Sequence, residues 1–230
     1  MYALTKSEAD RLMAHPYLTG IPRALVEPWL RFARWLHVPA GAMVLDFDDT
    51  TTEVFFVIQG SVRVVVRTAD GERTQILGDL QDGDLMGEMA ALDHVPRSAR
   101  AEALVNSTLC AMPGAVIREL MVSSPPVMLR LLQMLSRRVR LQNLRLLEHT
   151  ALSTRARLEA ELLRLSRPRA DGTRVVSPPP THEVLASRIG ARRETVSREL
   201  SAMTHAGHLR RTRSAIVLTD PLRFGRITEI

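Results

Sequence analysis

The stretch from Gly87 to Ala99 contains two side chains of opposite charge, Glu88 and Arg97, nine residues apart. A carboxylate can accept hydrogen bonds from ribose hydroxyls, and a guanidinium can donate a fixed pair of hydrogen bonds to a phosphate. The N–H groups of Gly87, Glu88 and Met89 and the Ser98 hydroxyl add further donors. These residue types suit a sugar phosphate, although a Glu88–Arg97 salt bridge on a loop explains the spacing equally well.

A second group of chemically competent residues lies in the segment HEVLASRIGARRETVSREL near the C-terminus. Ala186, Gly190 and Val196 have the spacing of the small residue, the turn glycine and the apolar anchor of a helix-turn-helix. Its second helix is predicted to begin near Arg192. The side chains predicted to read base edges are Arg193, Glu194, Ser197 and Arg198, and those predicted to contact phosphates are Thr181, Arg192 and Thr195. The alternative is a charged helix face that is merely solvated.

Charge is unevenly distributed along the 230 residues. Residues 1–150 carry 16 Lys and Arg against 17 Asp and Glu, whereas residues 151–230 carry 15 against 8, a net charge of +7. A surplus of this kind indicates a C-terminal module that binds a polyanion such as double-stranded DNA.

The first group of residues must be positioned by strands. Residues 38–109 are rich in β-branched and aromatic residues and are interrupted by turn signals, for example at Gly60 and Ser61. This pattern predicts an antiparallel barrel or sandwich, preceded by small helices over residues 5–36. The predicted fold class is therefore α+β, with an N-terminal β-barrel of jelly-roll type over residues 1–122.

A long helix is predicted over residues 123–150, starting at Ser123-Ser124-Pro125 with a hydroxyl cap and proline in the first turn. Steps of three and four residues define a coiled-coil seam. The seam consists of Leu132, Leu135, Val139, Gln142, Leu146 and His149. Other apolar residues lie outside it, so we expect two burial partners, the barrel and a second copy of the helix. A helix buried within one subunit is the alternative.

Residues 151–230 are predicted to form a winged helix-turn-helix. A helix over residues 151–165 is followed by a loop with a short strand, Thr181 is a suitable N-cap, and residues 208–220 favour a closing β-hairpin.

Several classes of protein are disfavoured by the sequence. There is neither a run of eighteen apolar residues nor a signal-peptide pattern, so we expect a cytoplasmic protein without a membrane partner. The single cysteine, Cys110, cannot hold an iron-sulfur cluster, and its simplest interpretation is a small buried apolar side chain. We expect no metal. His94 and His149 are candidate heme ligands only in principle, because exposed and core histidines are far commoner.

The segments GDLMGEMAALDHVPRSA and RRETVSREL together resemble the cyclic-AMP receptor/fumarate-nitrate regulator family of bacterial transcription factors over residues 38–224. The resemblance implies that Gly87 and Glu88 hold the ribose of a cyclic nucleotide, and that Arg97 and Ser98 hold its phosphate. It also implies that the long helix contacts the base through Gln142 and Asn143, where receptors of cyclic AMP commonly have Thr-Ser. Amide side chains can pair with adenine or guanine, so cyclic AMP is the first choice and cyclic GMP remains open.

The function implied is that of a homodimeric regulator, controlled by the nucleotide, that binds palindromic DNA with TGTGA-like half-sites about 34 Å apart. RNA polymerase is an expected partner. Two alternatives remain. The first is a ligand-independent DNA-binding protein, or one that senses another small molecule. The second is an enzyme in which Glu88 acts as a general base in phosphodiester hydrolysis, but no metal cluster or nucleophile-base pair accompanies Glu88 in the sequence.

Overall fold

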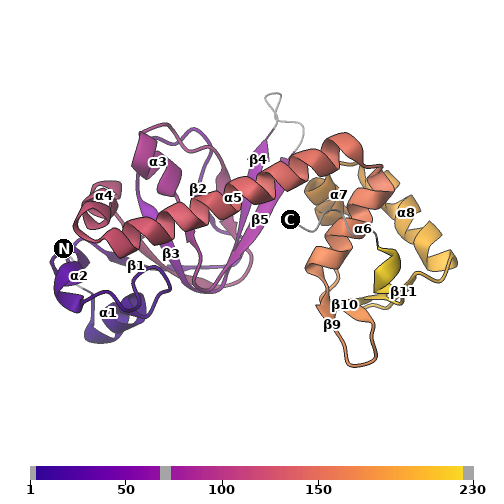
Figure 1. The fold of residues 1–230 in the computed structure, drawn as a ribbon, viewed down its shortest axis with the longest axis horizontal. Helices are drawn as coiled ribbons and strands as arrows, with labels where there is room; N and C mark the ends of the chain where they lie inside the picture. The colour runs from indigo at the N-terminus through magenta and orange to yellow at the C-terminus, as the bar shows by residue number, and fades with distance from the viewer. Residues whose placement is uncertain (1–3, 68–73, 225–230) are drawn as a thin grey trace. The chain divides into compact units, whose positions relative to one another are not determined.

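The structure, a computed structural model, describes residues 4–67 and 74–224. The chain divides into two compact units, residues 1–138 and residues 139–230. Helix α5 (Pro125–Ala151) begins in the first unit and ends in the second (Figure 1). The long helix predicted from the sequence is therefore present, and each unit contains one part of it.

The N-terminal unit combines short helices with antiparallel strands. Its helices are α1 (Lys6–Met13), α2 (Arg23–Leu30), α3 (Glu88–Asp93), α4 (Gly114–Ser123) and the first half of α5. Its strands are β1 (Arg34–Val38), β2 (Met43–Leu45), β3 (Val54–Gln59), β4 (Ser61–Arg67), β5 (Thr74–Gln81), β6 (Leu85–Met86), β7 (Arg100–Ala103) and β8 (Ser107–Met112). Residues 34–36, predicted to be helical, belong instead to β1.

The strands of this unit form two four-stranded sheets with the orders β1-β8-β3-β6 and β2-β7-β4-β5, and every pairing is antiparallel. The mixed fold and its jelly-roll-like character are confirmed. The sequence predicted an antiparallel barrel or sandwich, and the described strands form two separate sheets and not a closed barrel.

Strand β3 lies at the centre of the unit. Phe55 and Val57 belong to the apolar core that also contains Val62 and Ala101 of the other sheet. The alternate residues Val54 and Phe56 belong to a second core, which contains side chains from α1, α2, α4 and α5. Because successive residues of a strand point to opposite faces, β3 packs against the other sheet on one face and against helices on the other.

Gly60 separates β3 from β4, at the interruption predicted from the sequence at Gly60 and Ser61. The two strands belong to different sheets, so the chain crosses from one layer to the other at this glycine. Its φ is +116°, and a Cβ atom here would lie 2.2 Å from Ser107 Oγ. Glycine is therefore required for both backbone conformation and space.

Helix α5 starts at Pro125, as predicted, but without the expected hydroxyl cap. Ser123 Oγ donates a hydrogen bond to Leu120 O, and Ser124 Oγ has no partner among the described residues. Pro125 and Pro126 have no N–H group, which removes two donors that a cap would otherwise satisfy. The Ser124 carbonyl accepts the N–H groups of Val127 and Met128 instead.

The C-terminal unit is a winged helix-turn-helix. Its helices after α5 are α6 (Thr154–Leu165), α7 (His182–Ile189), α8 (Arg193–His205) and the 3₁₀ helix η1 (Pro221–Arg223). Its strands β9 (Arg167–Pro168), β10 (Arg174–Val176), β11 (Leu209–Arg211) and β12 (Ile216–Leu218) form one sheet in the order β11-β12-β10-β9. Hairpin β11–β12 is the predicted wing. Leu185 of α7 and Val196 and Leu200 of α8 are fully buried in the core of the unit.

Candidate functional site

Gly87 links β6 to α3 at the first predicted site. Its φ is +85°, in the left-handed region. A Cβ atom on this residue would lie 2.5 Å from Glu53 O and 2.7 Å from Arg97 Nη1. A side chain is therefore excluded both by the backbone conformation and by the close approach of two neighbours, one of them a predicted site residue.

Arg97 is buried, with 3% of its surface exposed. Its backbone is fixed by hydrogen bonds with the Asp48–Asp49 loop. Its guanidinium donates to Gly87 O at 2.9 Å and to Glu53 O at 2.7 Å, with a longer bond of 3.3 Å to Thr51 Oγ1. Burial lowers the pKa of Arg97, and the carboxylates of Asp49, Glu53 and Glu88 oppose this effect. The guanidinium is thus satisfied by protein oxygens.

Glu88 is equally buried, with 2% of its surface exposed. Its carboxylate forms an ion pair with Arg138 Nη1 of helix α5, and Arg138 Nη2 donates to Leu85 O at 2.5 Å. The structure thus brings Gly87, Glu88 and Arg97 together, but the two charged groups have separate partners. The simple Glu88–Arg97 salt bridge considered from the sequence is not among the observed ion pairs of the described residues.

The other predicted nucleotide contacts lie at the surface. Met89 is 51% exposed, and Ser98 Oγ lies 3.8 Å from its sulfur. Gln142 and Asn143 are exposed on the part of α5 that belongs to the C-terminal unit. Sequence reasoning missed Thr51 and Arg138. Thr51 carried no signal, while Arg138 was a basic residue close to apolar positions of a helix, which is a weak indication of a buried partner.

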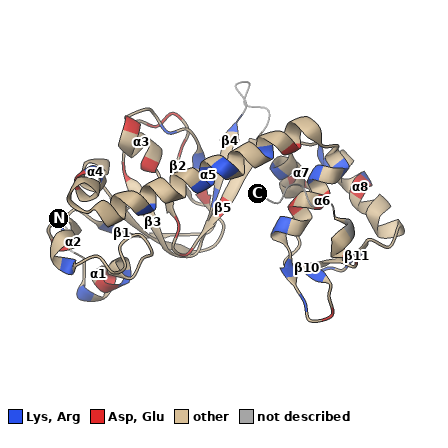
Figure 2. Cartoon of the chain, in the orientation of Figure 1, with Lys and Arg blue, Asp and Glu red and all other residues tan. Residues whose placement is uncertain are grey.

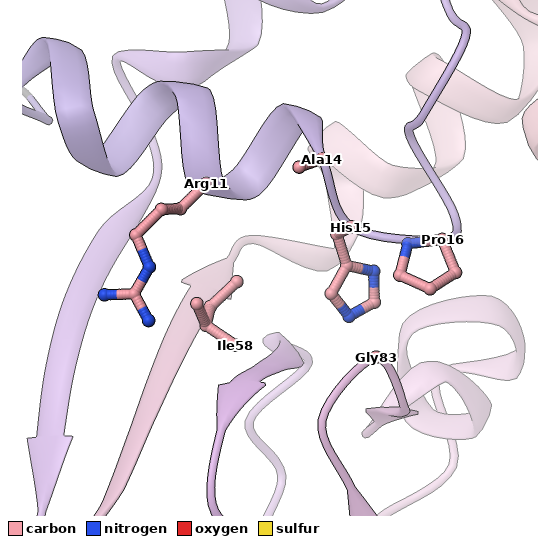
Figure 3. Close-up of a pocket in the computed structure, with 6 residues that line it drawn as sticks. All are labelled: Arg11, Ala14, His15, Pro16, Ile58 and Gly83. Atoms are coloured by element: carbon pink, nitrogen blue, oxygen red, sulfur yellow. The ribbon is translucent and has the colours of Figure 1, made fainter.

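A cavity of about 250 Å³ also lies in the N-terminal unit, at the end of α1 (Figure 3). It is lined by Arg11, Ala14, His15, Pro16, Ile58 and Gly83, none of which is a predicted site residue. His15 Nε2 donates to Asp84 O at 3.2 Å, and Arg11 donates to Gln59 Oε1 at 3.2 Å. One guanidinium nitrogen of Arg11 and the Nε2 of His15 are thus already bonded to neighbouring protein oxygens.

The predicted recognition elements are present in the C-terminal unit. Thr181 caps α7 by accepting a hydrogen bond from Val184 N at 3.2 Å. Gly190 ends α7 with φ +61°, and a Cβ atom here would lie 2.8 Å from Cε1 of His149. Arg192 is the residue before α8, where the second helix was predicted to begin.

Side chains on α8 and on the residue that precedes it differ in exposure. Arg192, Arg193, Glu194 and Arg198 are exposed, Thr195 and Ser197 are half-buried, and Val196 is buried in the core. The buried anchor holds α8 in place and leaves the charged side chains accessible, as direct readout of base edges requires. Figure 2 shows the basic residues on this unit.

Two features of this surface were missed from the sequence. His182 Nδ1 lies 3.0 Å from Ser197 Oγ, and His182 Nε2 lies 2.9 Å from Arg211 Nη2 of the wing. Arg210, Arg211 and Arg213 are exposed on or beside the wing. The three arginines were visible as a basic run in the sequence, but the histidine bridge joins residues far apart in the chain.

The predicted seam residues of α5 are mostly accessible. Leu132, Val139 and Leu146 are exposed by 50%, 57% and 64%. Gln142 is exposed, whereas Leu135 and His149 are half-buried. The His149 ring lies against Gly190 of the same chain.

Three further observations concern the described part of the chain. Residues 4–67 and 74–224 contain no group of three or more His, Cys, Asp or Glu side chains placed to hold a metal ion. Within the same ranges, no helix has the length and apolar character that crossing a membrane requires. Cys110 is fully buried, as predicted, and burial raises the pKa of its thiol to about 12.

Comparisons with known proteins agree with both halves of this description. The cyclic nucleotide-binding domain family matches residues 35–124, and the Crp-like helix-turn-helix domain family matches residues 156–227. A CRP-like cAMP-activated global transcriptional regulator of Mycobacterium tuberculosis is 27% identical over 191 residues, which cover 82% of this chain and 85% of that protein.

A solved structure of a CooA mutant from Carboxydothermus hydrogenoformans superposes with a TM-score of 0.75 at 19% identity, covering 96% of this chain and 95% of that one, and so supports the fold. Patatin-like phospholipase domain-containing protein 7 of Mus musculus is 26% identical over 108 residues. That match covers 44% of this chain and spans only 8% of the mouse protein.

Proposed function

The chain belongs to the Crp/Fnr family of transcription regulators, and from this premise we propose that it is a homodimeric, sequence-specific DNA-binding protein controlled by a cyclic nucleotide. Cyclic AMP is the first choice of effector and cyclic GMP the second. The observation that carries the proposal is the exposed cluster of Arg193, Glu194 and Arg198 on a helix anchored by Val196, in a chain that also has the Gly87–Glu88–Arg97 arrangement.

Recognition of DNA is assigned to the exposed face of α8. Arg193 and Arg198 have the fork of donors that pairs with guanine O6 and N7, and Glu194 can accept from cytosine N4. Ser197 contributes a hydroxyl, and Thr181, Arg192 and Thr195 are assigned to phosphates, which orient the protein without specifying sequence. TGTGA-like half-sites are the proposed target.

Dimerisation is assigned to the exposed apolar stripe of α5. Leu132, Val139 and Leu146 are each at least half exposed and follow heptad spacing. An apolar stripe of this kind is costly to leave in water, so a second copy of α5 is its proposed partner. The change of Val139 to Glu should convert dimer to monomer in analytical ultracentrifugation, and an unchanged mass would refute this assignment.

Nucleotide control is assigned to Glu88 and Arg97. A bound cyclic nucleotide would take hydrogen bonds that the protein now makes to itself, with its ribose hydroxyl replacing Arg138 at Glu88 and its phosphate replacing carbonyl oxygens at Arg97. Binding would thereby be coupled to helix α5 through Arg138. The assignment of the base to Gln142 and Asn143 rests on the family resemblance alone.

A second candidate is a regulator that needs no nucleotide. This candidate is favoured by the contacts of Glu88 and Arg97 within the protein. Both side chains already have protein partners and need no ligand to satisfy their charges. RNA polymerase is a proposed further partner under either alternative.

Two measurements test these assignments. Titration of cyclic AMP and cyclic GMP by calorimetry, followed by binding of a TGTGA palindrome with and without each nucleotide, separates the two candidates. A nucleotide that binds and tightens DNA binding supports the first. Tight DNA binding without any nucleotide response supports the second.

The base-reading role is tested by comparing Arg193→Ala with Arg192→Ala. The first should cost about 1–3 kcal/mol on the palindrome and much less on random DNA, whereas the second should weaken both duplexes alike. Equal losses for Arg193→Ala on the two duplexes would contradict direct readout.

A further inference from the structure

Three elements of the C-terminal unit meet at His182. The imidazole belongs to the first residue of α7, Ser197 to the recognition helix α8, and Arg211 to strand β11 of the wing. The ring lies within hydrogen-bonding distance of both, with 3.0 Å from Nδ1 to Ser197 Oγ and 2.9 Å from Nε2 to Arg211 Nη2. Helices α7 and α8 are not strands of the sheet that contains β11. The two contacts of the His182 ring therefore connect three elements through side chains.

The chemistry of the two partners determines which ring nitrogen carries the proton. A guanidinium can only donate hydrogen bonds, so Nε2 of His182 must accept with its lone pair. In a neutral ring the proton then resides on Nδ1 and is donated to Ser197 Oγ. This leaves the Ser197 hydroxyl proton available for an acceptor on DNA, such as a phosphate oxygen or a base edge.

The surroundings favour the neutral ring. Burial and the positive charges of Arg211 and Arg193 lower the pKa of His182 from 6.5. The imidazole is therefore uncharged at neutral pH, as acceptance by Nε2 requires.

We propose that His182 is a positioning residue for DNA recognition. In its Nδ1–H tautomer it orients the Ser197 hydroxyl and the Arg211 guanidinium, and it thereby fixes the recognition helix and the wing relative to each other. The inference rests on the proposed DNA-binding function. His182 acts through its two neighbours and is not itself assigned a contact with DNA.

The tautomer is tested without DNA, on the full-length protein. Long-range ¹H–¹⁵N correlation spectra at pH 7.5 distinguish the two neutral tautomers, and the His182→Gln variant identifies which of the seven histidine signals belongs to His182. The Nδ1–H form is expected. The Nε2–H form or an imidazolium would overturn the proposal.

The effect on recognition is tested with a double-mutant cycle. His182→Ala and Arg211→Ala should each weaken binding to the TGTGA palindrome about 5-fold, in keeping with the loss of one hydrogen bond, and the double variant should lose no more than the larger single variant. His182→Ala should change binding to random DNA by less than about 2-fold. His182→Gln, which keeps both a donor and an acceptor, should recover much of the loss.

His205→Ala is the matched control, because His205 is exposed at the end of α8 and its ring bonds to Ser201 O at 2.8 Å, within the same helix. It should bind like the wild type. Additive losses in the cycle, or equal losses on both duplexes, would overturn the positioning role. If the wild type binds neither duplex, the proposed function fails instead, and the tautomer measurement still decides the state of His182.

Discussion

In the N-terminal unit, Glu88 and Arg97 expose only 2% and 3% of their surface, whereas Arg193, Glu194 and Arg198 in the C-terminal unit are exposed. Both sets consist of charged residues that the sequence predicts to contact a ligand. The first set is bound by Arg138, by carbonyl oxygens and by Thr51, and the second set points from a helix whose apolar side is buried.

The difference has a physical cause. A charged group removed from water must find partners within the protein, because an unpaired buried charge is very costly. An exposed charge on a helix is solvated and needs no such partner. Substitution in the N-terminal site should therefore affect stability as well as binding, whereas substitution on α8 should affect binding alone.

The largest expected effect belongs to Gly87. Gly87→Ala should reduce the free energy of unfolding of the N-terminal unit by about 4 kcal/mol, because it adds a clash with Glu53 O to the strain of a positive φ. Urea denaturation monitored by tryptophan fluorescence measures this selectively, since both tryptophans of the chain, Trp29 and Trp35, lie in that unit.

The control for this prediction is Gly41→Ala in the same unit. Gly41 has φ +81°, close to that of Gly87, but a Cβ atom added there would have no neighbouring atom within 4 Å. It should cost only about 1 kcal/mol. Equal effects at the two glycines would show that the close approach to Glu53 and Arg97 is unimportant.

The comparison is tested directly by the same substitution in each unit. Arg97→Ala should destabilise the N-terminal unit by about 3 kcal/mol, because Gly87 O and Glu53 O lose their donor. Arg193→Ala should change stability by less than about 0.5 kcal/mol. Denaturation followed by far-UV circular dichroism reports on both units. A similar small loss for both variants would break the proposed contrast.

A pH effect should distinguish the N-terminal unit as well. Burial lowers the pKa of His15 to about 4, against 6.5 for an unburied histidine. Between pH 6.5 and pH 4 the unfolded chain binds more protons at His15 than the folded unit does. The contribution of His15 to the free energy of unfolding is therefore fully present above pH 6.5 and is lost as the pH falls toward 4. The loss from this residue should be about 3 kcal/mol.

His15→Gln isolates this contribution, since the variant cannot titrate there. The difference in unfolding free energy between wild type and variant, measured by tryptophan fluorescence, should change by about that amount between pH 7 and pH 4. A difference that stays constant with pH would show that His15 is not held neutral by burial.

The smallest effect is expected for the ion pair of Glu88 with Arg138. A double-mutant cycle with Glu88→Gln and Arg138→Gln should give a coupling of about 1–2 kcal/mol, limited because the Arg138 side chain is 35% exposed. The exposed pair of Arg23 with Asp10 is the control and should couple by less than about 0.5 kcal/mol. Equal couplings would argue that burial of Glu88 does not strengthen its pair.

Local signals in the sequence predicted several elements correctly. Thr181 and Gly190 marked the two ends of α7, and Pro125 marked the start of α5. These predictions succeeded because caps, left-handed glycines and prolines act on backbone groups within a few residues. The signal at Gly60 marked the end of β3 but did not reveal that β4 belongs to the other sheet, because the same glycine can serve a turn within a sheet or a passage between two sheets.

Residue types and spacing determined by themselves that this chain has a glycine-carboxylate-arginine cassette followed by a basic helix-turn-helix, because both are motifs of short sequence range. Only the tertiary structure decided that Arg138 pairs with Glu88, that carbonyl oxygens of residues 53 and 87 hold Arg97, and that His182 bridges Ser197 and Arg211. These contacts join residues 10 to 50 positions apart. Their geometry depends on how whole elements pack, and no local pattern specifies that packing.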